Sequence, residues 1–300
     1  MTTSKTETSG WFFAIGAFTW WGLAPIYFKA IAMVSAPEIL AHRIIWCIPV
    51  TLLLMFALQK KILIKQTIAN KKLLLGLVTT TLLISGNWFI FTWAVTHEHI
   101  LATSLGYFIN PIMSILMGVI LLGERITRLQ WAAAIAVSLG VTNQIVNYGE
   151  IPWVSLSLAI SFALYGFIRK QLSVDSLNGL LVETGIALPV AVAYLAWSLS
   201  QQSALFLSGS WDIDLLLMAG GIVTAVPLIW FGAAAKKIPL NSLGFLQFLA
   251  PSISFILATQ VYNEPLGAKQ LLSFILIWIG LGLYLIRPIQ NIFRERIKER

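Results

Sequence analysis

Residues 99–123 read HILATSLGYFINPIMSILMGVILLG, a stretch that contains no Asp, Glu, Lys or Arg. A helix needs about 20 mainly apolar residues to cross the hydrocarbon core of a bilayer, and this stretch is long enough. Apolar and polar residues do not alternate along it, so it does not resemble a strand of a membrane barrel. The stretch therefore predicts a transmembrane α-helix over residues 100–122.

Similar stretches recur along the whole chain. Hydrophobic residues make up 58% of the sequence and charged residues 11%, against about 25% charged in an ordinary globular protein, and the mean hydropathy is +0.84. A large buried soluble core does not give ten such stretches in a row. We therefore expect an all-α membrane protein with ten transmembrane helices, over residues 11–33, 38–58, 73–95, 100–122, 129–147, 152–168, 177–199, 213–235, 238–260 and 267–286.

The distribution of basic residues predicts the orientation. Ten helices place both termini on one side of the membrane, and this side collects most of the 20 basic residues. Positive charge gathers on the cytoplasmic face, so both termini are expected in the cytoplasm of a multi-pass protein. Besides the termini, this side carries Lys60, Lys61, Lys65, Lys71, Lys72, Arg125, Arg128, Arg169, Lys170, Lys236 and Lys237. The first helix lacks a signal-peptide cleavage pattern, so we expect it to be retained.

The composition also excludes several functions. The net charge of +8 is a topology signal, because no soluble segment is long enough to present a basic face to nucleic acid. One Cys and three His exclude a disulfide framework and leave little for a metal site. The sequence has no Walker A, HExxH or GxSxG motif. We therefore expect no cofactor, no metal and no enzyme activity.

Two segments suggest an internal repeat. Pro111 precedes Glu124 by thirteen residues, and Pro251 precedes Glu264 by the same spacing. Each half would hold five helices, an odd number, so the second half would insert upside down relative to the first. Such inverted repeats are typical of secondary transporters. The expected parts are a cytoplasmic N-terminal tail, two five-helix repeats and a basic cytoplasmic C-terminal tail, over residues 1–10, 11–147, 148–287 and 288–300.

Several motifs resemble a known family. They are Trp21–Lys29 (WGLAPIYFK), Glu38–Arg43 (EILAHR), Gly86–Trp88 (GNW), Ser104–Pro111 (SLGYFINP), Gly123–Arg125 (GER) and Gly220–Leu228 (GGIVTAVPL). Together they resemble the RarD-type permeases of the EamA family, in the drug/metabolite transporter superfamily, over roughly residues 10–288. The resemblance implies a bacterial inner-membrane permease with two inverted five-helix repeats. It also implies a central cavity lined by helices 1–4 and 6–9, with helices 5 and 10 peripheral.

Three ionisable residues lie inside predicted spans, where charge is costly and marks a candidate functional site. Lys29 and Arg43 lie toward the outer side, and Glu183 lies in the inner third of its helix. The two cations could clamp an anion or carboxylate, or could extend to the outer headgroups. Glu183 could bind a proton or a cation, or could serve as a structural hydrogen-bond partner.

Amides and aromatic residues form a second set of candidates. Inside a membrane an amide must find a partner, so inter-helix bonding competes with a role in solute binding. Asn110 precedes Pro111, where the helix loses a backbone hydrogen bond and a cavity can form. Aromatic side chains in mid-span could instead form a cage for an organic solute. The candidates of this set are Asn87, Trp88, Tyr107, Asn110, Tyr165 and Gln247.

The sequence thus predicts a secondary permease that moves a small organic solute by alternating access, with the proton gradient as the candidate driving force. The alternative is a membrane-embedded enzyme that acts on a lipid or isoprenoid, for which the adjacent His97 and Glu98 are a weak signal. Small residues in helices 5 and 10 permit close packing. They are compatible with packing inside the chain or with a homodimer.

Overall fold

The computed structural model describes residues 2–96, 100–148, 153–262 and 268–298. This part of the chain is helical and contains no strand. Its elements are α1 (Thr2–Ala30), α2 (Ala36–Ala57), α3 (Ile64–Ala69), α4 (Lys71–Thr96), α5 (Ile100–Leu121), α6 (Arg128–Tyr148), α7 (Trp153–Gln171), α8 (Ser176–Ser200), α9 (Trp211–Lys237), α10 (Leu240–Gln247), α11 (Leu249–Ile256), the π-helical turn η1 (Leu257–Val261) and α12 (Ala268–Lys298). The predicted all-α class is confirmed.

Most helices are long and apolar enough to cross a membrane. Within the described residues, seven candidate spans meet both criteria, in α1, α2, α4, α6, α8, α9 and the segment from α10 to η1. Two shorter apolar helices cover Leu105–Leu121 in α5 and Leu271–Ile286 in α12. Within the described residues, helix accounts for most of every predicted range, including the range of α7. The assignment of ten spans to two inverted repeats stays a proposal.

The helices differ from the predicted ones in four respects. α1 begins at Thr2 and α12 continues to Lys298, so helix extends into both segments expected as tails. The short helix α3, between α2 and α4, was not predicted. The predicted range 238–260 is divided after Gln247. Proline lacks an N–H, so Pro251 leaves the carbonyl of Gln247 without its helical partner, which accounts for this division.

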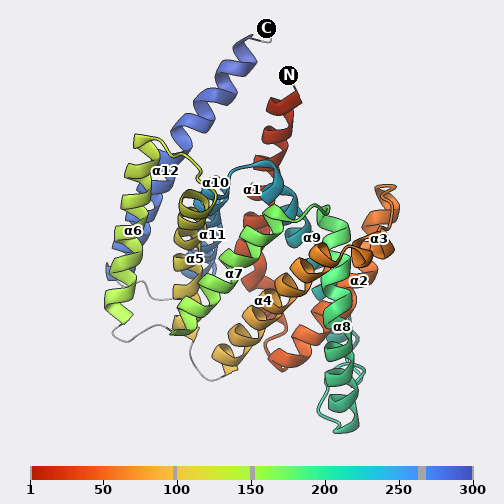
Figure 1. Ribbon diagram of the computed structural model, residues 1–300. Helices are drawn as coiled ribbons and strands as arrows, with labels where there is room; N and C mark the ends of the chain where they lie inside the picture. Colours follow the sequence, from red (N-terminus) through yellow and green to blue (C-terminus); the bar gives the residue numbers. More distant parts are fainter. Residues whose placement is uncertain (1, 97–99, 149–152, 263–267, 299–300) are drawn as a thin grey trace.

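The helices alternate in direction, and α1 begins at the same end of the bundle at which α12 finishes (Figure 1). The closest packing joins helices from different halves of the sequence. α6 packs on α12, α5 packs on α7 and α10, α1 packs on α9 and α11, and α2 packs on α8 and α9. α6 and α12 form one edge of the bundle (Figure 1).

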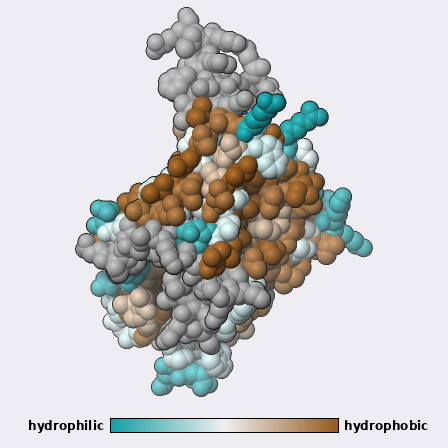
Figure 2. All heavy atoms as spheres, turned by 90° about the vertical axis from the view of Figure 1, so that its left-hand side faces the viewer, coloured by the Kyte–Doolittle hydropathy of each residue, from teal (hydrophilic) through white to brown (hydrophobic). Residues whose placement is uncertain are grey.

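The buried core is aromatic where α1, α7 and α9 meet. The ring of Phe231 stacks on Tyr165 at a centroid distance of 6.0 Å and contacts Phe162 at 5.2 Å. In contrast, Ile135 and Leu139 on α6 are more than half exposed. Hydrophobic side chains cover most of the face that carries this edge of the bundle (Figure 2). Apolar surface on this scale is rare on a soluble monomer, and it fits contact with lipid tails.

Small residues bring α6 and α12 together. A Cβ atom added to Gly280 would lie 2.8 Å from the carbonyl oxygen of Ala133, and one added to Gly140 would lie 2.8 Å from that of Ser273. Backbones this close leave no room for a side chain. The small residues of these two helices therefore serve packing within the chain, and a homodimer stays a prediction.

This contact predicts a difference between two glycines of α12. Gly280→Ala places a methyl group against α6, whereas Gly282→Ala meets nothing within 4 Å. Both changes raise helix propensity equally, so their difference reports the clash. We expect Gly280→Ala to be the less stable variant by about 1–3 kcal/mol. Thermal unfolding of the two purified proteins in detergent measures this, and equal melting temperatures would contradict the packing.

Candidate functional site

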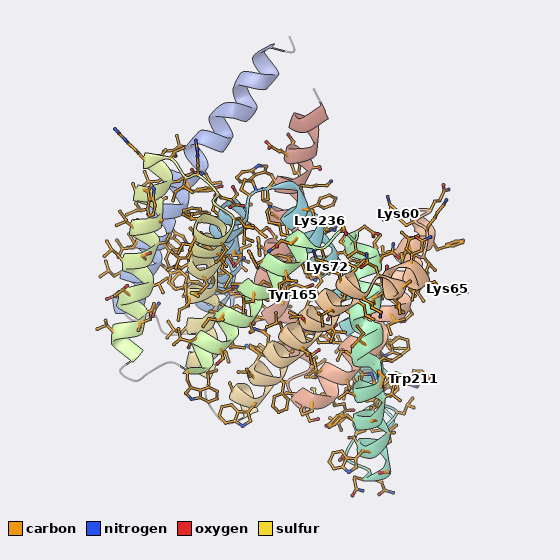
Figure 3. All side chains as sticks on the ribbon, in the orientation of Figure 1. Lys60, Lys65, Lys72, Tyr165, Trp211 and Lys236 are labelled. Atoms are coloured by element: carbon orange, nitrogen blue, oxygen red, sulfur yellow. The ribbon has the colours of Figure 1, made fainter. Side chains whose placement is uncertain are left out.

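Glu183 lies on α8 in the interior of the bundle, with 3% of its surface exposed. The hydroxyl of Thr80 on α4 donates to its Oε1 atom at 2.6 Å. The hydroxyl of Tyr165 on α7 donates to its Oε2 atom at 3.4 Å. Tyr165 lies in the middle of the bundle (Figure 3). Three helices thus converge on one carboxylate.

Arg169, in the last turn of α7, is the charged partner of this carboxylate. Its Nη1 atom lies 3.8 Å from Oε1 of Glu183, and only 1% of the side chain is exposed. Its Nη2 atom donates to the carbonyl of Ser176 at 3.3 Å. A side chain at Gly179 would collide with the guanidinium, and one at Gly232 would crowd it at 3.2 Å, so glycine at both positions leaves room for it.

The burial of Arg169 corrects an expectation from the sequence. We expected this residue among the exposed cytoplasmic cations, because it follows the predicted range 152–168. The structure instead places it inside α7, turned toward Glu183. In the described chain, its Nε and Nη1 atoms have no hydrogen-bond partner. The carboxylate of Glu183 is therefore the main group that offsets the cost of burying the guanidinium charge.

A small cavity adjoins the carboxylate. Its free volume is about 10 Å³, which is the room for about one water molecule. Glu183, Ser85 and Thr184 are among its lining residues, together with Trp88 and several apolar side chains. The cavity thus connects Glu183 with an aromatic residue of α4.

Arg43 lies on the other side of Trp88. Its Nε atom donates to the hydroxyl of Thr224 on α9 at 2.8 Å. Its guanidinium carbon lies 4.8 Å from the ring centroid of Trp88 and 5.5 Å from that of Phe28. A guanidinium over aromatic faces is a favourable cation–π arrangement. No carboxylate of the described residues lies within 4.0 Å of this half-buried side chain.

Comparison with known proteins agrees with this architecture. Residues 8–143 match the EamA-like transporter family. Protein RarD of Escherichia coli K12 is 41% identical over 286 residues, which cover 95% of this chain and 97% of that protein. An uncharacterized transporter of Vibrio cholerae is 40% identical, over 90% of each chain. A solved crystal structure shares the fold with a TM-score of 0.71 at 16% identity, over 92% of this chain and 96% of the other.

The chain belongs to the EamA family of transporters. The identity to RarD proteins of several bacteria extends over most of the chain, so it is a RarD-type member of the family. Its many apolar helices and these relatives identify it as a multi-pass membrane transporter. The family resemblance read from the motifs is confirmed.

Two of the predicted site residues of this RarD-type protein bond neighbouring helices. Asn87 donates from Nδ2 to the carbonyl of Leu158 at 2.8 Å and to the hydroxyl of Ser161 at 2.9 Å. Gln247, 4% exposed, donates from Nε2 to the hydroxyl of Ser114 at 3.0 Å. These contacts give both amides a partner across a helix interface.

The remaining predicted residues lie apart from Glu183. Lys29 is exposed at the end of α1, with its Nζ atom 3.5 Å from the ring centroid of Tyr262. Tyr107 is 53% exposed, and its ring contacts Phe91 edge-on at 6.2 Å. The Oδ1 atom of Asn110 is buried and has no hydrogen-bond partner in the described chain. The structure therefore brings together Glu183, Tyr165 and Trp88, with Arg43 against Trp88.

The imidazole of His42 is buried near the predicted outer side, as is the carboxylate of Glu38. The Nδ1 atom of His42 accepts a hydrogen bond from Trp46 at 3.2 Å. The carboxylate of Glu38 accepts the backbone N–H groups of Leu205 and Phe206 at 2.8 and 2.9 Å, and so fixes the loop before α9. Both are packed inside the protein, and neither lines the cavity beside Glu183. His97 and Glu98 lie outside the described residues.

Sequence reasoning missed Arg169, Thr80 and Thr224. A hydroxyl in a span is a weak signal, since it can donate to the carbonyl of the preceding turn, and the Thr80 hydroxyl also lies 3.0 Å from the carbonyl of Leu77. Arg169 had a usable signal, because it follows Tyr165 by four residues and therefore shares its helix face.

The buried ion pair predicts a non-additive stability effect. Arg169→Met leaves an unpaired carboxylate in the interior, and breaking such a pair costs about 3–5 kcal/mol. The double variant with Glu183→Gln removes both charges and should regain most of the lost free energy of unfolding. Thermal unfolding of the single and double variants in detergent measures the coupling. Lys72→Met, an exposed lysine, is the control, and additive single effects would contradict the pair.

Proposed function

We propose that this chain is a secondary permease that moves a small organic solute across the bacterial inner membrane by alternating access. The observation that carries the proposal is the polar cluster in the bundle interior, where Trp88 separates Arg43 from the cavity beside Glu183. A buried carboxylate and a half-buried guanidinium are expensive in a membrane. Such groups are the expected lining of a solute path, not of a purely structural bundle.

Two inverted repeats of five helices account for the packing. The Pro–Glu spacing relates α5 to the α10–α11 segment, and the same offset relates α1 to α7. The repeat relation exchanges α5 with α11 and α7 with α1, so the contact between α5 and α7 should recur between α11 and α1, and both pairs are in contact. The relation exchanges α6 with α12, so the contact between these two helices is related to itself. We retain residues 11–147 and 148–287 as the two repeats.

The orientation follows from the lysines. Lys60 and Lys236 lie on the upper part of the bundle (Figure 3), toward the end where α1 begins and α12 finishes. Positive loop residues favour the cytoplasm. Both termini are therefore assigned to the cytoplasmic side.

Arg43 supports an anionic group on the solute. Its Nε atom is held by Thr224, and the aromatic faces of Trp88 and Phe28 flank the guanidinium. A guanidinium held in this way can bind a carboxylate through two parallel N–H donors. The apolar body of the solute would then lie against the aromatic rings.

Glu183 is the proposed coupling group. Its carboxylate is held by hydroxyl donors and Arg169, beside space for about one water molecule. Protonation would cancel its attraction to Arg169 and loosen the contact between α7 and α8. A proton could in this way change the arrangement of helices next to the solute.

The cytoplasmic end is closed by a contact between the halves. The carboxylate of Glu124, in the loop after α5, accepts the backbone N–H groups of Leu240 and Asn241 at 2.7 and 2.8 Å. It also accepts the Nδ2 group of Asn241 at 2.8 Å. Close approach is possible because Gly118 carries no side chain there. We propose that this latch opens when the transporter exposes its cavity to the cytoplasm.

The transport proposal is tested in proteoliposomes with a pH dye inside and organic anions, amino acids and chloramphenicol outside. We expect a saturable, solute-dependent proton signal that falls to background in Arg43→Ala and in Glu183→Gln. Lys29→Ala, at the exposed end of α1, is the matched control and should keep the signal.

Labelled-solute uptake separates the components of the proposal. Normal solute uptake without proton movement would mean that Glu183 has a structural role and does not couple transport to protons. Wild-type flux in both variants would remove the cluster from the transport path. A chemically changed solute would indicate the enzyme instead.

The latch predicts altered access to the start of α10. Glu124→Ala removes the acceptor of three hydrogen bonds, so the cytoplasm-open state should become more populated. Ser242→Cys, 4% exposed in this state, reports it through labelling with a water-soluble maleimide after Cys47→Ala. We expect labelling to rise severalfold with Glu124→Ala. The exposed Pro239→Cys is the control, and unchanged labelling of Ser242→Cys would contradict the latch.

A further inference from the structure

A second hollow opens at the basic end of the bundle, away from the polar cluster. Its volume is about 370 Å³. Four cations line it, from the loop after α5, the end of α7 and the end of α9. They are Arg125, Lys170, Lys236 and Lys237. Lys236 lies on the upper part of the bundle together with Lys60 (Figure 3).

The charge of this hollow is not balanced by its own lining. Glu124 is the only carboxylate among the lining residues, and both of its oxygens already accept N–H groups of Leu240 and Asn241. Its Oε1 atom also lies 4.0 Å from Nζ of Lys170. One engaged carboxylate thus faces four cations, and the hollow carries an excess of positive charge.

Two of the cations are held in place. Lys170 donates from Nζ to the carbonyls of Ala235 and Ile238 at 3.0 and 2.6 Å. Lys237 donates to the hydroxyl of Ser9 at 2.8 Å, and its Nζ atom lies 4.8 Å from the ring centroid of Phe13. These contacts fix positive charge at the wall of the hollow.

The other two cations are available to a ligand. The side chains of Arg125 and Lys236 are exposed, and no ion pair joins either one to a carboxylate of the described chain. An Arg fork and a Lys point charge at one concave site match the geometry of a phosphate group. Ile238 and Pro239 add apolar surface to the same lining.

We propose that this hollow binds the phosphate of an anionic phospholipid headgroup. Basic pockets between membrane helices on the cytoplasmic side bind such headgroups, and this one lies at the ends of α7 and α9, where a span leaves the hydrocarbon. Its lining joins the loop after α5 to α9 and to the residues before α10. A bound headgroup would therefore link the two halves next to Glu124. The proposal concerns a lipid site and does not depend on the solute.

The test is lipid binding to the purified full chain in detergent. Native mass spectrometry counts bound phosphatidylglycerol and phosphatidylcholine, and thermal unfolding gives the stabilisation by each. We expect the wild type to retain phosphatidylglycerol selectively. Arg125→Gln with Lys236→Gln should weaken this binding on the order of 30-fold, from the usual contribution of two cations near a membrane surface.

Two control variants separate the hollow from general positive charge. Lys60→Gln with Lys65→Gln removes the same charge from the loop around α3, and it should bind as the wild type does. Arg125→Lys with Lys236→Arg keeps the charge in the hollow and should retain selective binding. Equal loss in both neutralised pairs would overturn the site in favour of diffuse attraction.

A soluble ligand would be distinguished in the same assay. Inorganic phosphate and glycerol phosphate are added without lipid, and stabilisation is compared between the wild type and the Arg125→Gln with Lys236→Gln variant. Binding of these anions without any selectivity for phosphatidylglycerol would overturn the lipid assignment. Wild-type lipid binding by this variant would overturn the site altogether.

Discussion

The structure depends on one constraint, that a polar group inside a bilayer must find its partner within the protein. The helices satisfy the backbone, and the side chains in the spans satisfy one another. Their bonds join helices from different halves of the chain, so the same bonds that remove the cost of burial also hold the halves together. They connect Thr80 with Glu183, Arg43 with Thr224, Asn87 with Ser161, Ser114 with Gln247 and Asn143 with Ser273.

These bonds differ in what they imply for movement between the halves. A neutral amide–hydroxyl bond, such as Gln247 with Ser114, is complete without any ligand. The hydrogen bonds of Glu183 and Arg43 involve charged groups. The free energy of a buried carboxylate changes strongly when it is protonated, and that of a buried guanidinium changes strongly when an anion binds to it. We propose that this cluster couples the solute to movement between the halves. The neutral links are suited to hold the two halves of the chain together.

The all-α class and the apolar segments were predictable, because a membrane span must be apolar and long enough and both properties can be read from the local composition. The interior positions of Glu183 and Arg43 were predictable for the same reason, since charge inside a span stands out. The role of Arg169 was not, because an Arg at the end of a span fits the positive-inside pattern equally well when it turns inward. Nor was the partner role of Thr80, whose hydroxyl could have been satisfied by its own helix. Whether a side chain at a span end turns inward depends on the neighbouring helices, here on the room left by Gly179 and Gly232.

The different positions of Lys29 and Arg43 complete the argument for the site. Both are long cations toward the outer side of the first half, and both could have reached the headgroups by extending along the helix. Lys29 is exposed at the end of α1 and lies over Tyr262, where water and headgroups are within its reach. Arg43 is bonded to Thr224 and enclosed by Trp88 and Phe28. A guanidinium is weakly hydrated and tolerates such aromatic surroundings better than an ammonium does. Because the described residues give it no carboxylate within 4.0 Å, we propose that its partner is an anion that enters from solution.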